Sequence, residues 1–200
     1  MSRRSLLASG LAGISAAAAG GPAFAAAGDE AALSPSLLRR ALGALEKHRD
    51  GIAHRDVIAI ADFAKPSRAR RFHLLDVASG RLKSFLVAHG RGSDPEHTGW
   101  LERFSNQPSS NATSSGTFRT EGFYIGEHGR SIRLAGLDPT NNNAEPRGIV
   151  VHGAWYVSDA MARERGVLGR SQGCFALAED CLGEVFAQLG PGRMIYADKV

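Results

Sequence analysis

Residues 71–88, RFHLLDVASGRLKSFLVA, decide the fold class of this chain. Two apolar segments, 71–77 and 82–88, flank the turn residues Ala78-Ser79-Gly80-Arg81. Short apolar segments on either side of a glycine-containing turn are typical of a β-hairpin. We therefore expect two antiparallel strands here, within a β-rich core.

Other short segments show the same strand character and are separated by turns rich in Gly, Asn and Ser. They are residues 57–60, 122–125, 131–134 and 148–151. One segment nearer the N-terminus has helical spacing instead, behind the helix-start signal Ser34-Pro35-Ser36. Its apolar residues are Leu37, Leu38, Ala41, Leu42 and Leu45. The pattern predicts an α+β, β-rich domain with an N-terminal helix that ends near Asp50-Gly51.

Length and composition are those of a globular domain, with 200 residues, 43% hydrophobic and 22% charged. The formal net charge of +4 falls to +2 if Arg3 and Arg4 are removed with a leader. A surplus this small gives no support for nucleic-acid binding. The two cysteines, Cys174 and Cys181, are too few for a disulfide scaffold.

The N-terminal residues 1–27 have the pattern of a signal peptide. A short basic head precedes an apolar stretch without acids, and Ala23-Phe24-Ala25 fits the small-x-small rule for cleavage. Glycines, serines and Pro22 make the stretch too weakly apolar for a good membrane span, although a retained anchor is the alternative. Ser2-Arg3-Arg4-Ser5-Leu6-Leu7 resembles a twin-arginine signal, but paired arginines also occur in ordinary signals. We expect export and a single mature domain over residues 34–200, without a membrane span.

A long polar stretch, residues 90–118, interrupts the strand pattern and offers Trp100, Leu101 and Phe104 for burial. A loop of this length inside a compact domain is more often functional than idle. A mobile surface insertion is the alternative interpretation.

The residues best suited to chemistry lie in two segments, 149–153 (IVVHG) and 169–177 (GRSQGCFAL). A cysteine attacks as its thiolate, so Cys174 is a candidate nucleophile if a base or a positive environment assists it. His152 closes an apolar strand segment and is a candidate general base, with a backbone carbonyl to orient its ring. On spacing alone, an inert cysteine and a structural histidine remain the alternative.

The sequence after Cys174 has a helical pattern that stops at Gly190-Pro191-Gly192. Its apolar residues are Leu177, Cys181, Leu182, Val185, Phe186 and Leu189. Cys174 would then lie just before a helix, where free amides and the helix dipole stabilise a thiolate. The same amides, those of Cys174 and Gly173, could bind the oxyanion of an acyl-transfer intermediate.

Three other kinds of site are disfavoured. The segment GRSQG matches the G-x-S-x-G elbow of serine hydrolases, but the last histidine, His152, precedes Ser171, and no apolar strand leads into the elbow. No zinc signature is present, His89 and His97 are a weak pair, and we expect neither a metal nor another cofactor. Cys174 and Cys181 on one helix would lie about 10 Å apart, too far for a disulfide.

These residues carry a resemblance to a known family. His152-Gly153 and Ser171-Gln172-Gly173-Cys174 resemble the H-G and S/T-H-G-C signature of the YkuD-like L,D-transpeptidases, which remodel bacterial peptidoglycan. Further pieces match in order over about residues 62–177, and they are 88–93, 104–106, 124–131, 134–137 and 147–157. The resemblance implies a β-sandwich or barrel-like catalytic core with an N-terminal helix and a helix after the nucleophilic cysteine.

The resemblance also implies a reaction. Cys174 would attack the L-centre carbonyl of a stem tetrapeptide, usually that of meso-diaminopimelate, and release D-alanine, while His152 moves the proton. The acyl group would pass to an amine of a neighbouring stem, giving a 3,3 cross-link. Members of this family are also acylated by carbapenems. The implied partners are peptidoglycan stem peptides, and the implied location is the periplasm or cell-wall compartment of a bacterium.

The chain departs from the family pattern near the nucleophile. Gln172 replaces a histidine or tryptophan, Phe175 a proline and Val167 an arginine. Gln172 cannot titrate, so acid–base work falls on His152. The departures leave two alternatives open, an L,D-carboxypeptidase or endopeptidase with water as acceptor, and a non-catalytic wall-binding protein.

Several residues are expected to contact the substrate. Arginines grip carboxylates bidentately, so Arg170 is a candidate clamp, with Arg147 and Arg133 as further candidates. The other expected contacts are Ser171, Gln172, Gly153 and Tyr124. Solvated arginines without a ligand are the ordinary alternative.

Overall fold

The computed structural model describes residues 32–200. The predicted signal peptide, residues 1–27, therefore lies outside the described residues. Within the part that is described, no helix is both long and apolar enough to cross a membrane.

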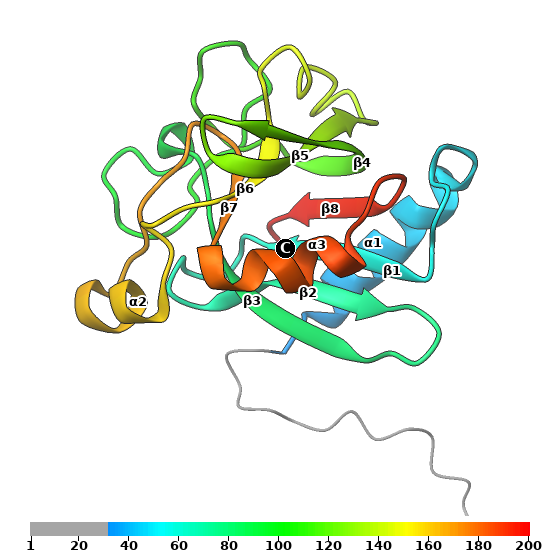
Figure 1. Cartoon of the computed structure of the whole chain (residues 1–200), viewed down its shortest axis with the longest axis horizontal. Coiled ribbons are helices and arrows are strands. Elements are labelled where there is room, and N and C mark those ends of the chain that lie inside the picture. Colours follow the sequence, from blue (N-terminus) through cyan, green and yellow to red (C-terminus); the bar gives the residue numbers. More distant parts are fainter. Residues whose placement is uncertain (1–31) are drawn as a thin grey trace, which may run out of the picture.

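Eight strands close into a barrel in the order β1-β2-β3-β7-β6-β5-β4-β8 (Figure 1). Their bounds are β1 Val57–Asp62, β2 Arg70–Asp76, β3 Leu82–Ala88, β4 Gly116–Gly126, β5 Gly129–Gly136, β6 Val150–Gly153, β7 Phe175–Leu177 and β8 Met194–Asp198. Two neighbouring pairs are parallel, β6 with β7 and β1 with β8, and the others are antiparallel. The predicted β-rich α+β fold class is confirmed, and closure removes the exposed strand edges that an open sheet leaves.

The predicted hairpin is confirmed, since β2 and β3 pair antiparallel around a turn in which Gly80 has φ +70°. The other predicted strand segments fall on β1, β4, β5 and the start of β6. Strands β7 and β8 were not expected. All three residues of β7 are buried, so the alternation that marks a half-buried strand is missing.

Helix α1, Pro35–Lys47, starts at the predicted Ser34 and Pro35 signal and lies on the outside of the barrel. It buries Leu37, Ala41 and Leu45 in a cluster with β1, β2 and β8. Arg49–Gly51, a short 3-10 turn (η1), follows it, so the predicted end of the helix is confirmed to within a few residues.

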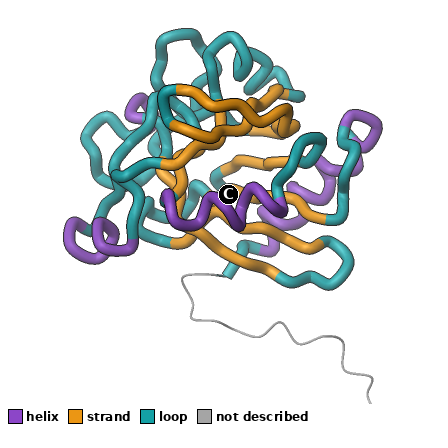
Figure 2. Tube along the Cα trace, viewed as in Figure 1, coloured by secondary structure: helices purple, strands orange, loops and turns teal. Residues whose placement is uncertain are grey.

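The remaining helical segments surround the barrel, as Figure 2 shows. They are the 3-10 turns η2, Arg91–Ser93, and η3, Glu179–Cys181, and the helices α2, Asp159–Arg165, and α3, Leu182–Gln188. Ser158 caps α2 by accepting a hydrogen bond from the Met161 amide at 3.1 Å. Helix α3 contributes Val185 and Phe186 to the central core inside the barrel.

The prediction that a helix begins directly after Cys174 is wrong. Strand β7 follows Cys174 at once, and α3 begins only at Leu182. The reason is burial inside the barrel: the Phe175 ring lies at the centre of an aromatic cluster, with its centroid 5.3 Å from that of Phe118. The gain from burying Phe175 and Leu177 in the barrel outweighs the helical periodicity.

His73 on β2 is a buried titratable group with a consequence for stability. Its Nδ1 lies 2.7 Å from Ser84 Oγ, and its Nε2 has no hydrogen-bond partner among the described residues. Burial, followed by the charge of Lys65, lowers the pKa of His73 to about 4. In the unfolded chain the pKa of His73 is the ordinary 6.5, so between pH 6.5 and 4 the unfolded state binds this proton and the folded state does not. The free energy of unfolding is therefore highest above pH 6.5 and decreases as the pH falls from 6.5 towards 4.

We expect the free energy of unfolding to decrease by about 3 kcal/mol over that pH range from His73 alone. His73→Gln removes the titrating ring and should flatten the pH dependence of urea unfolding, whatever its effect at pH 7. His54 is exposed, so His54→Gln is the matched control and should keep the wild-type slope. An unchanged slope in His73→Gln would contradict this assignment.

Candidate active site

The strand register brings His152 and Cys174 to the same face of the barrel wall. Val151 on β6 lies opposite Phe175 on β7, and both side chains are in the central core. Side chains alternate along a strand, so His152 and Cys174 point to the outer face. Extended by one residue, the parallel register places Cys174 beside Val150, so Cys174 and His152 lie on neighbouring strands with their side chains on the same face.

The His152 ring is buried and held by a backbone carbonyl, as the sequence analysis allowed. Its side chain is 2% exposed, and Nδ1 lies 2.8 Å from the Gly153 carbonyl oxygen. Because a carbonyl only accepts, Nδ1 donates and Nε2 is left without a proton. Burial lowers the pKa of His152 below its ordinary value, so the ring is neutral at pH 7. Nε2 is therefore ready to accept a proton.

Cys174 is half-buried, and its Sγ lies 3.6 Å from the Gly148 carbonyl oxygen. Burial raises the pKa of the thiol, against the opposing effects of the Val150 amide and the charge of Arg147. The expectation of a thiolate stabilised by a helix N-terminus is wrong, because a strand follows Cys174. The resting site thus has a neutral thiol and a neutral imidazole on the same barrel face.

Residues 171–174 form a tight turn held by a serine hydroxyl, and we call them the nucleophile loop. Ser171 Oγ donates to the Cys174 carbonyl at 2.7 Å and accepts from the Gly173 amide at 3.1 Å. The backbone of Ser171 pairs with the segment after β3, through His89 at 2.9 Å and Arg91 at 2.8 Å. Ser171 thus shapes the loop, and the Gly173 amide is occupied by its hydroxyl.

Comparison with known proteins assigns this arrangement to a family. The family model described as the L,D-transpeptidase catalytic domain matches residues 29–197. The chain belongs to the L,D-transpeptidase family. The predicted resemblance to that family is confirmed for the domain as a whole.

Solved L,D-transpeptidases are similar to this one at low identity. A Mycobacterium smegmatis L,D-transpeptidase is 15% identical, with a TM-score of 0.44 and coverage of 72% of this chain and 58% of that chain. L,D-transpeptidase 3 from Mycobacterium tuberculosis, in complex with a faropenem-derived adduct, is 13% identical, with a TM-score of 0.45 and coverage of 72% and 60%. Bd1075 of Bdellovibrio bacteriovorus is 11% identical, with a TM-score of 0.44 and coverage of 72% and 48%. The present chain spans less than two thirds of each of these chains, and no curated protein matches its sequence.

Gly173 occupies a position that only glycine fits. Its φ is +118°, and a β-carbon there would lie 2.7 Å from the Ala112 carbonyl oxygen and 2.9 Å from Ile149 Cδ1. We expect Gly173→Ala to destabilise the fold by roughly 1–3 kcal/mol and to displace the thiol. Thermal unfolding and the rate of Cys174 alkylation by iodoacetamide measure the two effects.

The matched control is Gly183→Ala. Gly183 lies in α3 with no atom within 4 Å of an added β-carbon, and alanine favours a helix. This variant should keep or slightly raise the unfolding temperature and leave thiol reactivity unchanged. Wild-type stability and reactivity in Gly173→Ala would show that the close packing of the loop does not position Cys174.

A buried polar network lies next to the nucleophile loop. Arg71 is fully buried and donates to the Val87 carbonyl, at 3.2 and 3.0 Å, and to His89 Nδ1 at 2.7 Å. His89 Nε2 then donates to Asp94, 3.2 Å away. Both ring nitrogens are occupied, and burial with the Arg71 charge lowers the pKa of His89 to about 3. His89 is therefore a neutral structural residue.

The two histidines considered for zinc, His89 and His97, have separate hydrogen-bond partners. His97 Nε2 lies 2.7 Å from the Leu168 carbonyl oxygen, and His89 is committed to Arg71 and Asp94. Across residues 32–200, no group of three or more His, Cys, Asp or Glu side chains could hold a metal ion.

Arg147 connects the long polar stretch, residues 90–118, to the surroundings of Cys174. Arg147 donates to the carbonyls of Ser105, at 2.8 Å, and Ala112, at 2.5 Å, and to Ser114 Oγ at 2.7 Å. The charge of the same guanidinium opposes the rise in the pKa of Cys174 that burial causes. Residues 105–114 are thereby tied to the nucleophile, which favours the functional interpretation of this stretch over a mobile insertion.

The other predicted substrate contacts fall into two groups. Arg170 donates to the carbonyls of Asp94 and Pro95, so its guanidinium already ties the nucleophile loop to its neighbour. Gln172 is exposed beside Cys174 and has room to meet a substrate. Gly153 supplies the carbonyl for His152.

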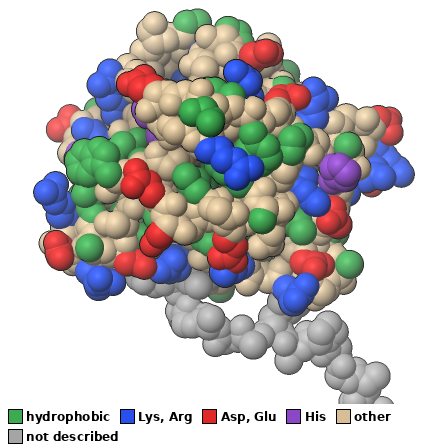
Figure 3. Space-filling model, in the orientation of Figure 1, with side chains coloured by type: hydrophobic (Ala, Val, Ile, Leu, Met, Phe, Trp, Pro, Cys, Tyr) green, Lys and Arg blue, Asp and Glu red, His purple; other side chains and the backbone are tan. Residues whose placement is uncertain are grey.

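Tyr124 and Arg133 lie on the same outer face as the cysteine and the histidine. Arg133 pairs with Val150, the residue across from Cys174, and its guanidinium lies 4.2 Å over the Tyr124 ring. The β4–β5 and β5–β6 registers place Tyr124 in the row of His152. On this face Arg133 is exposed and Tyr124 is half-buried. Elsewhere the surface exposes apolar side chains such as Ile125, at 85%, and the side of the molecule drawn in Figure 3 carries apolar patches between interspersed charges.

Sequence reasoning missed two residues of the site. Tyr156 packs over Gly169, and burial together with Cys174 raises the pKa of its hydroxyl to about 12. His128, in the turn between β4 and β5, stacks on His152 with ring centroids 4.1 Å apart. Both lie in segments that match the family, 124–131 and 147–157, but neither has a spacing that marks it as part of the site.

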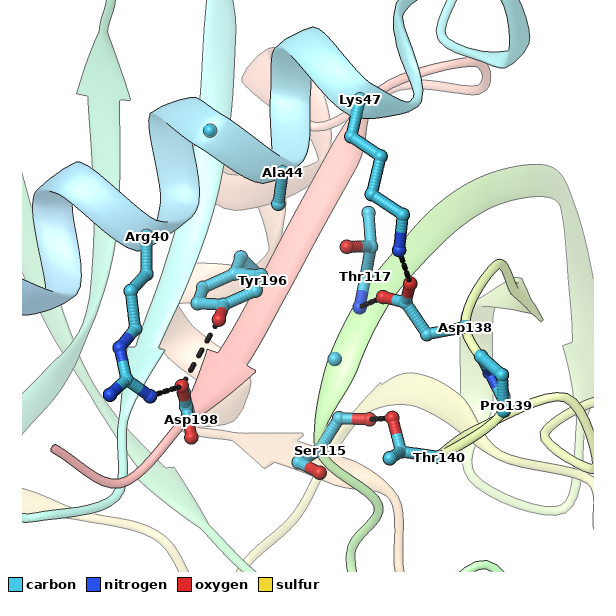
Figure 4. A pocket seen from close by; sticks show the side chains of 12 residues that line it. Arg40, Ala44, Lys47, Ser115, Thr117, Asp138, Pro139, Thr140, Tyr196 and Asp198 are labelled. Atoms are coloured by element: carbon cyan, nitrogen blue, oxygen red, sulfur yellow. Dashed lines mark hydrogen bonds and ion pairs between the residues drawn. The ribbon is translucent and has the colours of Figure 1, made fainter.

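A cavity of about 490 Å³ lies elsewhere on the domain, between α1, β8 and residues 138–140 (Figure 4). Its charged groups are paired with one another: Lys47 with Asp138 at 2.6 Å and Arg40 with Asp198 at 2.9 Å. None of the residues discussed for catalysis lines it. The chemistry of the site therefore belongs to the open face around Cys174.

Proposed function

We propose that this chain is an exported cysteine L,D-transpeptidase that acts on peptidoglycan stem peptides. The observation that carries the proposal is the placement of His152, with Nε2 free to accept a proton, on the same barrel face as Cys174 in a chain of this family. A nucleophile and a base oriented by a third group are the parts that acyl transfer requires.

In the first half-reaction, Cys174 Sγ attacks the carbonyl carbon of the L-centre in a stem tetrapeptide. The thiol proton moves to His152 Nε2 as the S–C bond forms. The tetrahedral intermediate then breaks its C–N bond, and His152 returns the proton to the departing nitrogen of D-alanine. A thioester on Cys174 and free D-alanine result.

In the second half-reaction, an amine of a neighbouring stem attacks the thioester. His152 accepts a proton from the attacking amine and returns it to the sulfur of Cys174 as the C–S bond breaks. The product is an amide cross-link, and the free thiol is regenerated. Water in place of the amine would give hydrolysis instead.

The electrostatics of the site support activation of the thiol on demand. The pKa of Cys174 is raised and that of His152 is lowered, so the neutral pair is the stable resting state. Cys174 therefore need not be a thiolate before the substrate binds. Its proton moves to His152 only when the carbonyl group of the substrate is in place. Protection of the resting thiol from oxidation follows, because oxidation needs the thiolate.

The outer face offers groups suited to a stem peptide. We propose that Arg133, stacked on Tyr124, and the exposed Gln172 contact it, while Arg170 and Ser171 keep the loop in shape. An arginine matches the carboxylates of diaminopimelate and D-alanine. The proposed location is the periplasm or the cell-wall compartment, in keeping with the signal-like residues 1–27.

The test is incubation of the purified protein with tetrapeptide muropeptides, followed by chromatography and mass spectrometry. Dimers with loss of D-alanine are the expected product. Tripeptide monomers without dimers would replace transfer by hydrolysis at the same site. Unchanged tetrapeptides would contradict the proposal and favour a wall-binding role.

A further inference from the structure

The turn of the β4–β5 hairpin places a second imidazole directly against the proposed base. Glu127 and His128 form this turn, and the His128 ring stacks on His152 with centroids 4.1 Å apart and an interplanar angle of 21°. His128 is exposed, whereas His152 is 2% exposed. In Figure 1 the hairpin lies beside β6. The His128 ring therefore covers one face of the His152 ring against water.

The His152 ring is held by two contacts, one at its edge and one at its face. The hydrogen bond from Nδ1 to the Gly153 carbonyl, at 2.8 Å, lies at the edge of the ring. The second torsion of a histidine side chain has a broad minimum, so one contact at the edge leaves the tilt of the ring loosely set. The stack on His128 acts on the face and restricts that tilt. The tilt determines where Nε2 points.

The stack also bears on the charge that His152 acquires. After it accepts the thiol proton, His152 is a cation against the face of an aromatic ring, which is favourable when His128 is neutral. A protonated His128 would instead repel the His152 cation. Burial is the largest effect that lowers the pKa of His152, and the charge of His128 lowers it further. The other charged groups nearby are Glu127 and Arg130 on the hairpin and Glu179, which packs beside Gly153.

We propose that His128 is a positioning residue for the general base, an inference that rests on the proposed function of His152. The His128 ring fixes the tilt of the imidazole so that Nε2 faces Cys174, and it keeps water from that face.

The test compares His128→Ala, which removes the ring, with His128→Phe, which keeps a planar ring without a charge. In His128→Ala we expect kcat for tetrapeptide turnover to fall about tenfold with little change in KM, because a misplaced base slows the step rather than binding. In His128→Phe kcat should return close to the wild-type value. Glu127→Ala, in the same turn, is the control and should leave kcat unchanged.

A second readout uses the free enzyme and needs no turnover. Titration of the His152 ring followed by NMR should show a higher pKa in His128→Ala, since both the cover and the neighbouring charge are gone. An unmoved titration and wild-type kcat in His128→Ala would overturn the proposal, as would His128→Phe behaving like His128→Ala. If the wild-type enzyme shows no turnover, the proposed function fails, and an unmoved His152 titration in His128→Ala would still overturn the role of His128.

Discussion

Cys174→Ala should abolish turnover of tetrapeptide stems, with a loss of at least about 1000-fold, because the reaction has no other nucleophile at this site. The unfolding temperature should stay close to that of the wild type, since a small half-buried side chain is replaced by another small one. Release of D-alanine and thermal unfolding are the two measurements.

Cys181→Ala is the matched control for this result. Cys181 is the second free cysteine, it is also half-buried, and burial followed by the charge of Asp180 raises its thiol pKa to about 11. We expect this variant to turn over at the wild-type rate. Activity that survives in Cys174→Ala, or that is lost in Cys181→Ala with the fold intact, would assign the chemistry to another residue.

His152→Asn should reduce the rate of Cys174 acylation by about 10² to 10⁴ at pH 7, the usual contribution of a general base. The pH profile should change as well. In the wild type His152 must be neutral, so kcat/KM should fall only as the pH drops below 6.5, because burial holds the pKa of His152 below that ordinary value. In His152→Asn the rate should instead rise with the ionisation of the thiol, whose pKa burial raises above 9.0.

Acylation rates between pH 4.5 and 10 separate these profiles. A variant that recovers activity at high pH has lost a base and kept its nucleophile. A wild-type profile with a lower plateau, or one in which the acid limb survives in His152→Asn, would mean that another group accepts the proton.

Sequence patterns predicted the elements whose start and turn signals lie close to them in the chain. The hairpin of residues 71–88 and helix α1 have their turn and start signals within a few residues, and both are present. Strand β7 was missed because three buried residues carry no period, and a helical pattern runs across it from Leu177 onwards. What makes residues 175–177 a strand is Val151 and Val87 on its neighbours, which are distant in the chain.

The sequence predicts a candidate base and nucleophile, but it did not predict the electrostatics around them. The motifs point to His152 and Cys174, and the register of β6 and β7 brings these two residues to one face. The predicted helix N-terminus led to a lowered thiol pKa, whereas the structure raises it through burial. His128 could not be found from spacing, because a hairpin turn brings it to His152 from another part of the sheet.

The central claim is that Cys174 carries the acyl group. Peptide mapping by mass spectrometry, after the enzyme reacts with a tetrapeptide muropeptide or a carbapenem, tests it most directly. We expect one covalent adduct, on the peptide that contains Cys174, and none when His152→Asn is treated for the same short time at pH 7. An adduct on Cys181, or no adduct on either cysteine, would contradict it.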